Sequence, residues 1–106
     1  MNPLPELQVN VEARGPTVIV HVSGEVDMGS EAVMRAALEA GVAPGCDLVL
    51  DLADVSFFGS SGLSVCVHVH HDVARVGGRF RLRRPSPVVA RVLALTALDE
   101  VLEIEP

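Results

Sequence analysis

The chain has 106 residues, of which 49% are hydrophobic and 3% aromatic, and its formal net charge at pH 7 is −6. This length suits one domain with a real core, and the aliphatic content is that of a globular rather than a disordered protein. The negative charge argues against binding to nucleic acid or anionic membranes. Because the chain lacks a membrane-spanning apolar run and a signal-peptide pattern, we expect a cytoplasmic protein.

The first half of the chain predicts a hairpin followed by a helix. Residues 1–6 are expected to be flexible. Apolar and polar residues alternate over 7–13, and a more apolar strand follows over 17–22 after a short turn, which indicates an antiparallel hairpin. A helix is expected over 30–40. Its apolar face is expected to consist of Ala32, Val33, Ala36, Ala37 and Ala40.

The second half alternates strands with helices. Strands are expected at 47–52, 79–83 and 101–104, separated by helices over 60–76 and 88–95, the last of them capped by Ser86. Strands that alternate with helices need crossover connections. The prediction is therefore a single α/β domain over 1–106, with a mixed, mostly parallel sheet of about five strands, an N-terminal antiparallel hairpin and helices packed on the sheet.

The helix over 60–76 has an unusually wide apolar surface. The stripe expected to face the core consists of Leu63, Cys66, Val67, His70, Val73 and Ala74. Val65, Val69 and Val76 lie beside it. The helix therefore either offers a surface to a partner protein or is buried more completely, and apolar breadth alone leaves both interpretations open.

Residues 59–62, Gly-Ser-Ser-Gly, join a predicted strand to the helix that follows it. Unpaired N–H groups and the helix dipole favour an anion at a helix N-terminus, so a phosphate could be bound or attached here. Serine also caps helices well, and the residues alone leave capping and phosphorylation equally open. The pattern is not a nucleophile elbow, because Leu63 stands where that motif needs glycine.

The other polar clusters receive a structural interpretation. His68 and His71 could share a ligand, but only Asp72 joins them in sequence, so no metal site is predicted. Cys46 and Cys66 lack disulfide or zinc spacing and are expected to be buried thiols. A basic strip either keeps an exposed strand face soluble or binds an acidic partner. It comprises Arg79, Arg81, Arg83 and Arg84.

Three segments resemble the STAS domain of bacterial anti-sigma-factor antagonists. They are the acidic turn at 24–27 (Gly-Glu-Val-Asp), the central phosphorylation loop at 51–63 (Asp-Leu-Ala-Asp-Val-Ser-Phe-Phe-Gly-Ser-Ser-Gly-Leu), and the last helix with its turn at 86–99. The resemblance covers nearly the whole domain in the right order. It implies a single STAS-type α/β domain that is not an enzyme and takes no cofactor or metal.

The resemblance also implies a regulatory role. In that family the first serine of the pair is phosphorylated by a partner that is both serine protein kinase and anti-sigma factor; by position this serine is Ser60, with Ser61 as the second candidate. The unphosphorylated chain would bind the anti-sigma factor, phosphorylation would switch binding off, and a serine phosphatase would restore it. A monomer or weak homodimer is expected. The expected partner-binding residues are Asp27, Gly59, Ser60, Ser61, Gly62, Leu63 and Ser64.

Two positions depart from the family pattern and keep alternatives open. Gly59 stands where the family usually has Asp, which favours a STAS interaction module without phosphorylation, such as a scaffold or transport-complex subunit. Ala97 stands where the family often has Gly, and a left-handed alanine costs roughly 1 kcal/mol, so a different helix end is expected.

An enzyme is the other alternative, and the residues argue against it. A hydrolase would need a catalytic triad, but the histidines lie roughly 10 Å or more along the helix that Ser60 begins.

Overall fold

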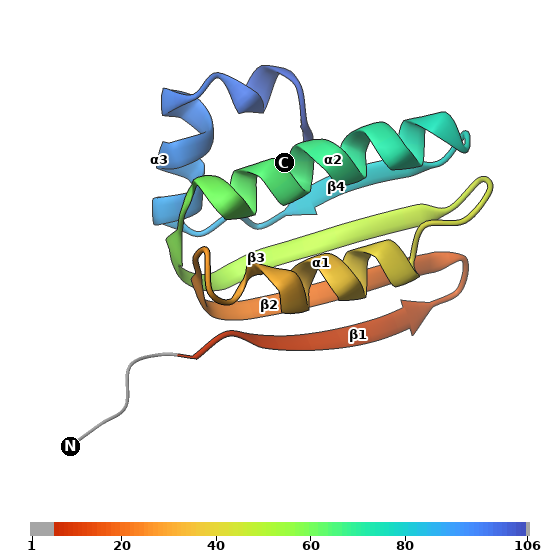
Figure 1. The fold of residues 1–106 in the computed structure, drawn as a ribbon. Helices are drawn as coiled ribbons and strands as arrows, with labels where there is room; N and C mark the ends of the chain where they lie inside the picture. Colours follow the sequence, from red (N-terminus) through yellow and green to blue (C-terminus); the bar gives the residue numbers. More distant parts are fainter. Residues whose placement is uncertain (1–5, 106) are drawn as a thin grey trace.

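A five-stranded sheet carries helices α1 and α2 on one face, with α3 at the end of the central strands (Figure 1). The computed structural model describes residues 6–105, so the expected flexibility of 1–6 falls, except for Glu6, outside the described residues. The elements are β1 (Gln8–Arg14), β2 (Thr17–Val26), α1 (Glu31–Ala40), β3 (Asp47–Phe58), α2 (Ser60–Arg75), β4 (Arg79–Arg83), α3 (Pro87–Leu95), a 3₁₀ turn (Leu98–Glu100) and β5 (Glu103–Ile104). The strands pair in sequence order, which was not predicted. The antiparallel pairing of β1 with β2 and the parallel pairing of the other strands confirm the prediction.

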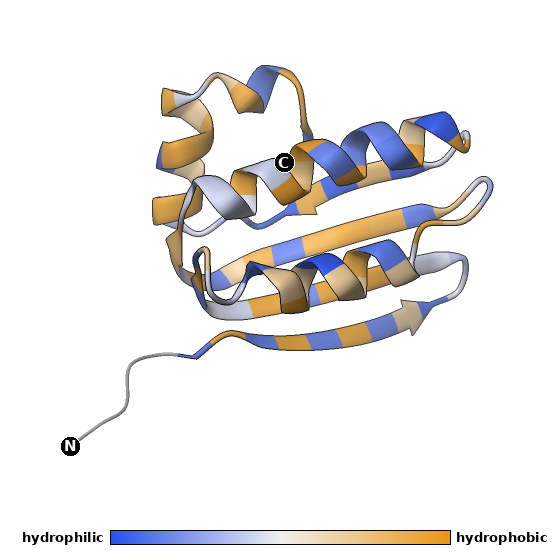
Figure 2. Ribbon diagram, in the orientation of Figure 1, coloured by the Kyte–Doolittle hydropathy of each residue, from blue (hydrophilic) through white to orange (hydrophobic). Residues whose placement is uncertain are grey.

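The core lies between the sheet and the helices. The central strands β2 and β3 are largely apolar in Figure 2, and alternate residues of each point towards the helices. Fully buried side chains from every layer meet there, among them Val20, Leu48, Leu50, Leu38, Cys66 and Leu93. Within the described residues no helix is long and apolar enough to cross a bilayer.

Two strands run further than the sequence indicated. β2 continues to Val26 and β3 to Phe58, past the ends predicted at residues 22 and 52. The pairing of Gly24 with Val55 and of Val26 with Phe58 extends the ladder across two irregularities in register. Polar residues that suggested strand ends therefore belong to the sheet, and Gly59 alone separates β3 from α2. The last strand is shorter than predicted, because Val101 and Leu102 still bond back to Leu98 at the end of the 3₁₀ turn and β5 begins only at Glu103.

The prediction of the buried face of α1 was wrong. Met34 and Leu38, one turn apart, are fully buried, whereas Val33 is 57% exposed. The alanines of the predicted face are exposed or half-buried, and none of them is as buried as Met34. Larger side chains remove more apolar surface from water, so Met34 and Leu38 decide how the helix is rotated. As a result, α1 keeps an apolar stripe that no residue between 6 and 105 buries fully.

The wide apolar surface of α2 reflects burial. Val65 and Val69, which lie beside the predicted stripe, are 1% and 2% exposed. Within the predicted stripe, Val67 and His70 are only half-buried and Ala74 is exposed. The face of α2 that packs on the core is therefore rotated away from these three residues. The breadth therefore fits a helix packed between the sheet and α1 rather than one presented along its length to a partner.

Ser86 precedes α3 as predicted, but its hydroxyl does not cap the helix. The buried hydroxyl donates to the carbonyl of Val55 at 2.7 Å, and the Ser86 N–H donates to the carbonyl of Leu52 at 3.1 Å. Both acceptors belong to β3. Ser86 therefore ties α3 to the extended part of β3 instead of satisfying the helix N-terminus.

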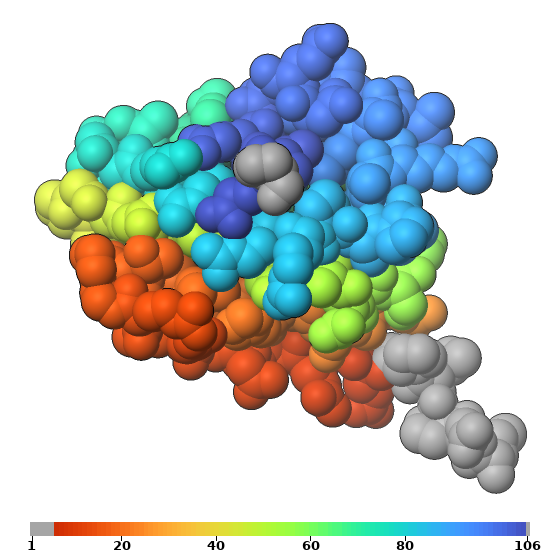
Figure 3. Space-filling view, turned by 180° about the vertical axis from the view of Figure 1, so that it is seen from behind, coloured from red at the N-terminus to blue at the C-terminus, as the bar shows by residue number. Residues whose placement is uncertain are grey.

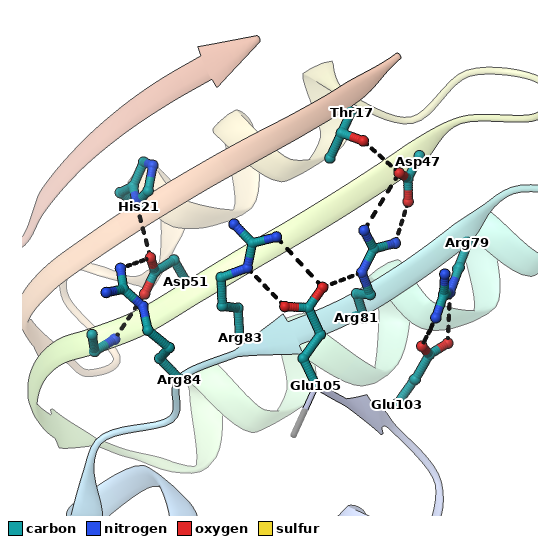
Figure 4. Close-up of polar contacts among 11 residues, drawn as sticks. Thr17, His21, Asp47, Asp51, Arg79, Arg81, Arg83, Arg84, Glu103 and Glu105 are labelled. Carbon is teal, nitrogen blue, oxygen red and sulfur yellow. Dashed lines mark hydrogen bonds and ion pairs between the residues drawn. The ribbon is translucent and has the colours of Figure 1, made fainter. Parts of the chain in front are cut away.

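The basic strip on β4 and the residue after it is paired within the chain. Figure 4 shows its arginines on the sheet face away from the helices, in contact with acidic residues of neighbouring strands. The pairs are Arg79 with Glu103, Arg81 with Asp47 and Glu105, Arg83 with Glu105, and Arg84 with Asp51. The sequence left open whether the strip binds an acidic partner or solubilises the face, and the structure shows that its carboxylate partners lie in the same chain.

Glu105 provides a test of this charged layer. Hydrogen bonds from Arg83 and Arg81 lower the pKa of Glu105 from 4.5 to about 2. Because the native pKa lies below the unfolded value, the stabilisation is present above pH 4.5 and is lost as pH falls towards 2. We expect Glu105→Gln to lower the free energy of unfolding at pH 7 by about 1 kcal/mol, after allowance for solvent screening, and to have little effect near pH 2.

Urea titrations at the two pH values measure this difference. Glu100→Gln is the matched control, since Glu100 is exposed and makes no ion pair with another residue between 6 and 105. An equal loss of stability at both pH values in Glu105→Gln would show that packing, not charge, is responsible.

Ala97 has a left-handed backbone, with φ 59° and ψ 16°, at the turn between α3 and the 3₁₀ turn. Glycine adopts this conformation without the steric cost that a Cβ imposes. We expect Ala97→Gly to raise the free energy of unfolding by about 0.5–1 kcal/mol in thermal or urea unfolding. Ala94→Gly, inside α3, should instead lower the free energy of unfolding by about 1 kcal/mol. Equal effects at both positions would contradict a steric cost at Ala97.

Candidate functional site

The two serines lie on the first turn of α2, at the edge of the sheet where β2 and β3 end. Gly59 connects β3 to α2; its N–H donates to the carbonyl of Val26 at 2.9 Å. Val26 and Phe58 are partners on adjacent parallel strands. Since the carboxyl ends of parallel strands meet at one edge, the turn after β2 lies beside the turn that carries Ser60.

Gly59, and neither serine, occupies the N-cap position of α2. Its backbone is extended (φ −84°, ψ 179°), and its carbonyl accepts the N–H groups of Gly62 and Leu63 at 3.1 and 3.2 Å. Ser60 and Ser61 are the first two helical residues, and no side-chain hydrogen bond caps the helix. The capping interpretation of the serines is therefore wrong. The Ser60 side chain is exposed and Ser61 is half-buried.

The remaining predicted residues divide into exposed and buried ones. Asp27 and Ser64 are exposed, whereas Gly62 and Leu63 are buried beneath the turn. A Cβ on Gly62 would lie 2.9 Å from the side chain of Val26, so glycine lets the helix start directly on the strands. Gly62 and Leu63 thus shape the site from below, and Asp27, Ser60 and Ser64 face solvent.

Asp27 is held in place by the turn that it begins. One carboxylate oxygen, Oδ1, accepts the N–H of Gly29 at 2.9 Å, the N–H of Ser30 at 3.0 Å and the hydroxyl of Ser30 at 3.0 Å. These bonds close the loop ahead of α1 and leave an exposed, positioned negative charge beside the Ser60 turn. Asp27 therefore combines a structural role with an accessible carboxylate.

Two exposed apolar side chains border this edge, and the sequence analysis missed both. Met28, next to Asp27, is 86% exposed, and Phe57, two residues before the N-cap, is 47% exposed. The Phe57 ring lies 3.4 Å from the point that a Cβ on Gly59 would occupy. The two consecutive phenylalanines could have indicated the exposure of Phe57. In a strand that continues to Phe58, side chains alternate between the two faces, so Phe58 is buried and Phe57 points outward.

The other candidate clusters do not join this site. His68 and His71 are exposed, and His68 is eight residues or about 12 Å along α2 from Ser60, too far for a serine–histidine pair. Residues 6–105 contain no group of three potential ligands placed to hold a metal ion. Cys66 is fully buried, which raises the pKa of its thiol to about 12, while Cys46 is only half-buried.

Comparison with known proteins shows that the chain is similar to anti-sigma factor antagonists. A family model described as STAS domain matches residues 8–106. The anti-sigma-B factor antagonist of Bacillus subtilis (strain 168) is 32% identical over 98 residues, which cover 92% of this chain and 90% of that protein. An anti-sigma factor antagonist from Mycobacterium paratuberculosis has a crystal structure with a TM-score of 0.85 at 31% identity, covering 95% of this chain and 86% of that chain.

The phosphorylated form of the Bacillus cell fate determinant SpoIIAA shares the fold. Its TM-score is 0.70 at 22% identity, and the match covers 93% of this chain and 92% of that chain. At this identity the likeness concerns the fold alone.

Proposed function

The chain belongs to the STAS domain family, and we propose that it is an anti-sigma factor antagonist controlled at Ser60. Unmodified, it binds an anti-sigma factor that is also a serine kinase, and this binding releases a sigma factor. Phosphorylation of Ser60 ends the binding, and a serine phosphatase restores it. The protein is a binding partner and a kinase substrate in the cytoplasm, with no catalysis of its own.

The observation that carries the proposal is the position of Ser60. Its side chain is exposed on the first helical residue of α2, and it has no capping role to lose. A phosphate there adds a charge of about −1.5 to −2 next to the positive end of the helix dipole, where the free protein tolerates it. A kinase can therefore modify Ser60 without unfolding the domain.

The same phosphate is costly inside a complex. Met28 and Phe57 offer apolar contact area beside Ser60, and Asp27 offers a charged contact. A partner that covers these residues removes water from Ser60. A doubly charged group in that position must be desolvated or expelled, so one modification separates the two proteins.

A reconstituted reaction tests the proposal. The purified chain is incubated with each anti-sigma factor kinase of its host, with and without ATP, and complex formation and protein mass are measured. We expect the chain and Ser64→Ala to form a complex that ATP dissolves as one phosphate is added. Ser60→Ala should stay unmodified and bound. Equal phosphorylation of Ser60→Ala, or binding to none of these kinases, would overturn the proposal.

Gly59 favours a second candidate, a STAS interaction module whose serines are not phosphorylated. The backbone at Gly59 is open to other residues, because the atoms nearest to an added Cβ would be the Phe57 ring at 3.4 Å and the Val26 carbonyl at 3.6 Å. Aspartate fits this N-cap position and would accept a free N–H group of α2. The chain thus lacks a carboxylate that its fold can accommodate.

We expect Gly59→Asp to raise the free energy of unfolding by a few tenths of a kcal/mol and to speed phosphorylation of Ser60. Gly59→Ala, which adds the Cβ without the carboxylate, is the control. Phosphate on Gly59→Asp but never on the natural chain, under the same kinase, would favour the unphosphorylated module. A loss of stability in Gly59→Asp relative to Gly59→Ala would contradict the N-cap geometry.

A further inference from the structure

β1 leaves a long edge of the sheet open. Its seven residues pair with β2 without a bulge, from Gln8 opposite Ser23 to Arg14 opposite Thr17. Nothing between residues 6 and 105 pairs with its other side, which is free along the length of the strand in Figure 1. Alternate N–H and C=O groups of an edge strand point outward and can pair with another strand. The opposite edge, β5, has only two residues.

The unburied stripe of α1 lies on the same side of the molecule. Arg35 and Glu39 line a groove with residues of α2, so that side of the helix faces α2. Successive residues of a helix turn by about 100°, which places Val33, Ala37 and Ala40 on the opposite side, towards β1. Contacts between α1 and β1 agree with this placement. The apolar stripe therefore overhangs the open edge.

β1 adds apolar surface to the same layer. Val9 packs against the core beneath the helices, and Val11, which points the same way, is 59% exposed. Together with Val33, 57% exposed, Val11 forms an apolar border along the edge. We propose that β1 and the outer stripe of α1 are the interface of a homodimer, in which β1 pairs antiparallel with β1 of a second copy.

The sequence of β1 is complementary to itself in this arrangement. With the two-fold axis at Val11, each Val11 faces its equivalent, Val9 faces Ala13 of the second copy, and Asn10 faces Glu12. Gln8 then faces Arg14. Apolar residues meet on the helix side of the sheet, and an amide meets a charged group on the other side. No two like charges stand directly opposite each other.

The geometry closes at two copies. Each chain has one β1, so two sheets of five strands join into one sheet of ten, and no free β1 edge remains. The alanines of α1 let the two helices approach across the axis. Because the joined strands are antiparallel, the two Ser60 turns point to opposite ends of the dimer. The dimer therefore leaves both turns accessible, and its test does not depend on whether Ser60 is phosphorylated.

Sedimentation equilibrium of the full chain from about 10 µM to about 1 mM tests the dimer. We expect the natural chain to dimerise in this range. Val11→Lys places two ammonium groups opposite each other and should weaken dimerisation at least about tenfold. Val33→Glu, on the helix, should have the same effect without touching the strand. Val101→Lys is the matched control, since Val101 is 51% exposed beside the opposite edge.

A natural chain that remains monomeric at about 1 mM would overturn the proposal. So would a dimer that Val11→Lys and Val33→Glu leave intact, because it would use another surface. Weakening by Val101→Lys to the same extent would point to a general effect of charge and also count against it. Circular dichroism of each variant establishes that the domain is folded.

Discussion

Replacing Ser60 by glutamate is expected to weaken binding to the anti-sigma factor about 100-fold, or about 2.7 kcal/mol. Ser60 is exposed on the first turn of α2, which follows β3 directly and lies beside the turn that holds the carboxylate of Asp27. A glutamate there is favoured by the helix dipole in the free protein. In the complex it must lose its water without a partner charge, and that difference lowers affinity.

Titration calorimetry with the cognate anti-sigma factor measures the effect. Ala74→Glu is the matched control, because Ala74 is exposed near the other end of the same helix, far from Ser60 and outside the expected partner-binding residues. We expect its affinity to stay within about threefold of that of the natural chain. Similar losses in both variants would indicate a general electrostatic effect of the acidic chain. An unchanged affinity of Ser60→Glu, with the fold intact, would contradict the switch.

The largest loss of stability is expected for Gly24→Ala, about 3 kcal/mol or more. Gly24 has φ +89°, where an alanine is strained, and a Cβ there would lie 2.2 Å from the carbonyl oxygen of Glu6. The backbone ahead of β1 therefore lies so close to Gly24 of β2 that only a hydrogen atom fits there. The segment at 24–27, which resembled an acidic turn in sequence but belongs to β2 as far as Val26, thus begins with glycine for a packing reason that sequence reasoning did not supply.

Gly15→Ala separates the two contributions to this loss. Gly15 also has a positive φ, +60°, but no atom lies within 4 Å of the position of its Cβ. We expect Gly15→Ala to lose only the conformational part, about 1 kcal/mol, in urea unfolding at neutral pH. Equal losses at the two glycines would show that the segment at Glu6 moves aside at no cost.

The order and type of the elements could be predicted because periodicity is a local property. Alternation over β1 and β4, and the stop after α2, depend on neighbouring residues alone, and the STAS family assignment drawn from three segments is confirmed. The ends of β2 and β3 could not be read in this way. Their continuation depends on bulged pairing between strands distant in sequence, which polar residues such as Ser23 conceal.

Other errors arose where tertiary packing decides the outcome. The rotation of α1 depends on Met34 and Leu38 fitting the sheet, and counting apolar residues gave the alanines too much weight. The hydroxyl of Ser86 was expected to cap α3, but it bonds to β3 across 31 positions in sequence. The partners of the β4 arginines lie on β3 and β5, or just after β5, so they also required the sheet order.

The site was predictable in outline. Ser60 and Ser61 stand at the helix start as expected, because a strand followed by small residues and an apolar segment identifies that junction. Which residue caps the helix was not predictable, since Gly59, Ser60 and Ser61 are all acceptable N-cap residues. The apolar border of Met28 and Phe57 emerged only when the two turns were placed side by side.

The face of the sheet away from the helices is charged, and it is separate from the edge that carries Ser60. Figure 3 views the molecule from behind, where the strands face solvent. Ile19 and Val49 are nonetheless 1% and 0% exposed, and they lie on this face by alternation. The paired arginine and carboxylate side chains beside them account for this burial, since long charged side chains cover apolar surface with their stems.

Phosphosite mapping and intact mass of the protein purified from its native host, across growth and stress conditions, test the central claim most directly. The natural chain is compared with Ser60→Ala. We predict a phosphorylated fraction in the natural chain, with the phosphate on Ser60, and none in the variant. Persistent absence of phosphate from the natural chain, or an equal fraction in Ser60→Ala, would contradict control at Ser60 and leave a STAS module that binds without this switch.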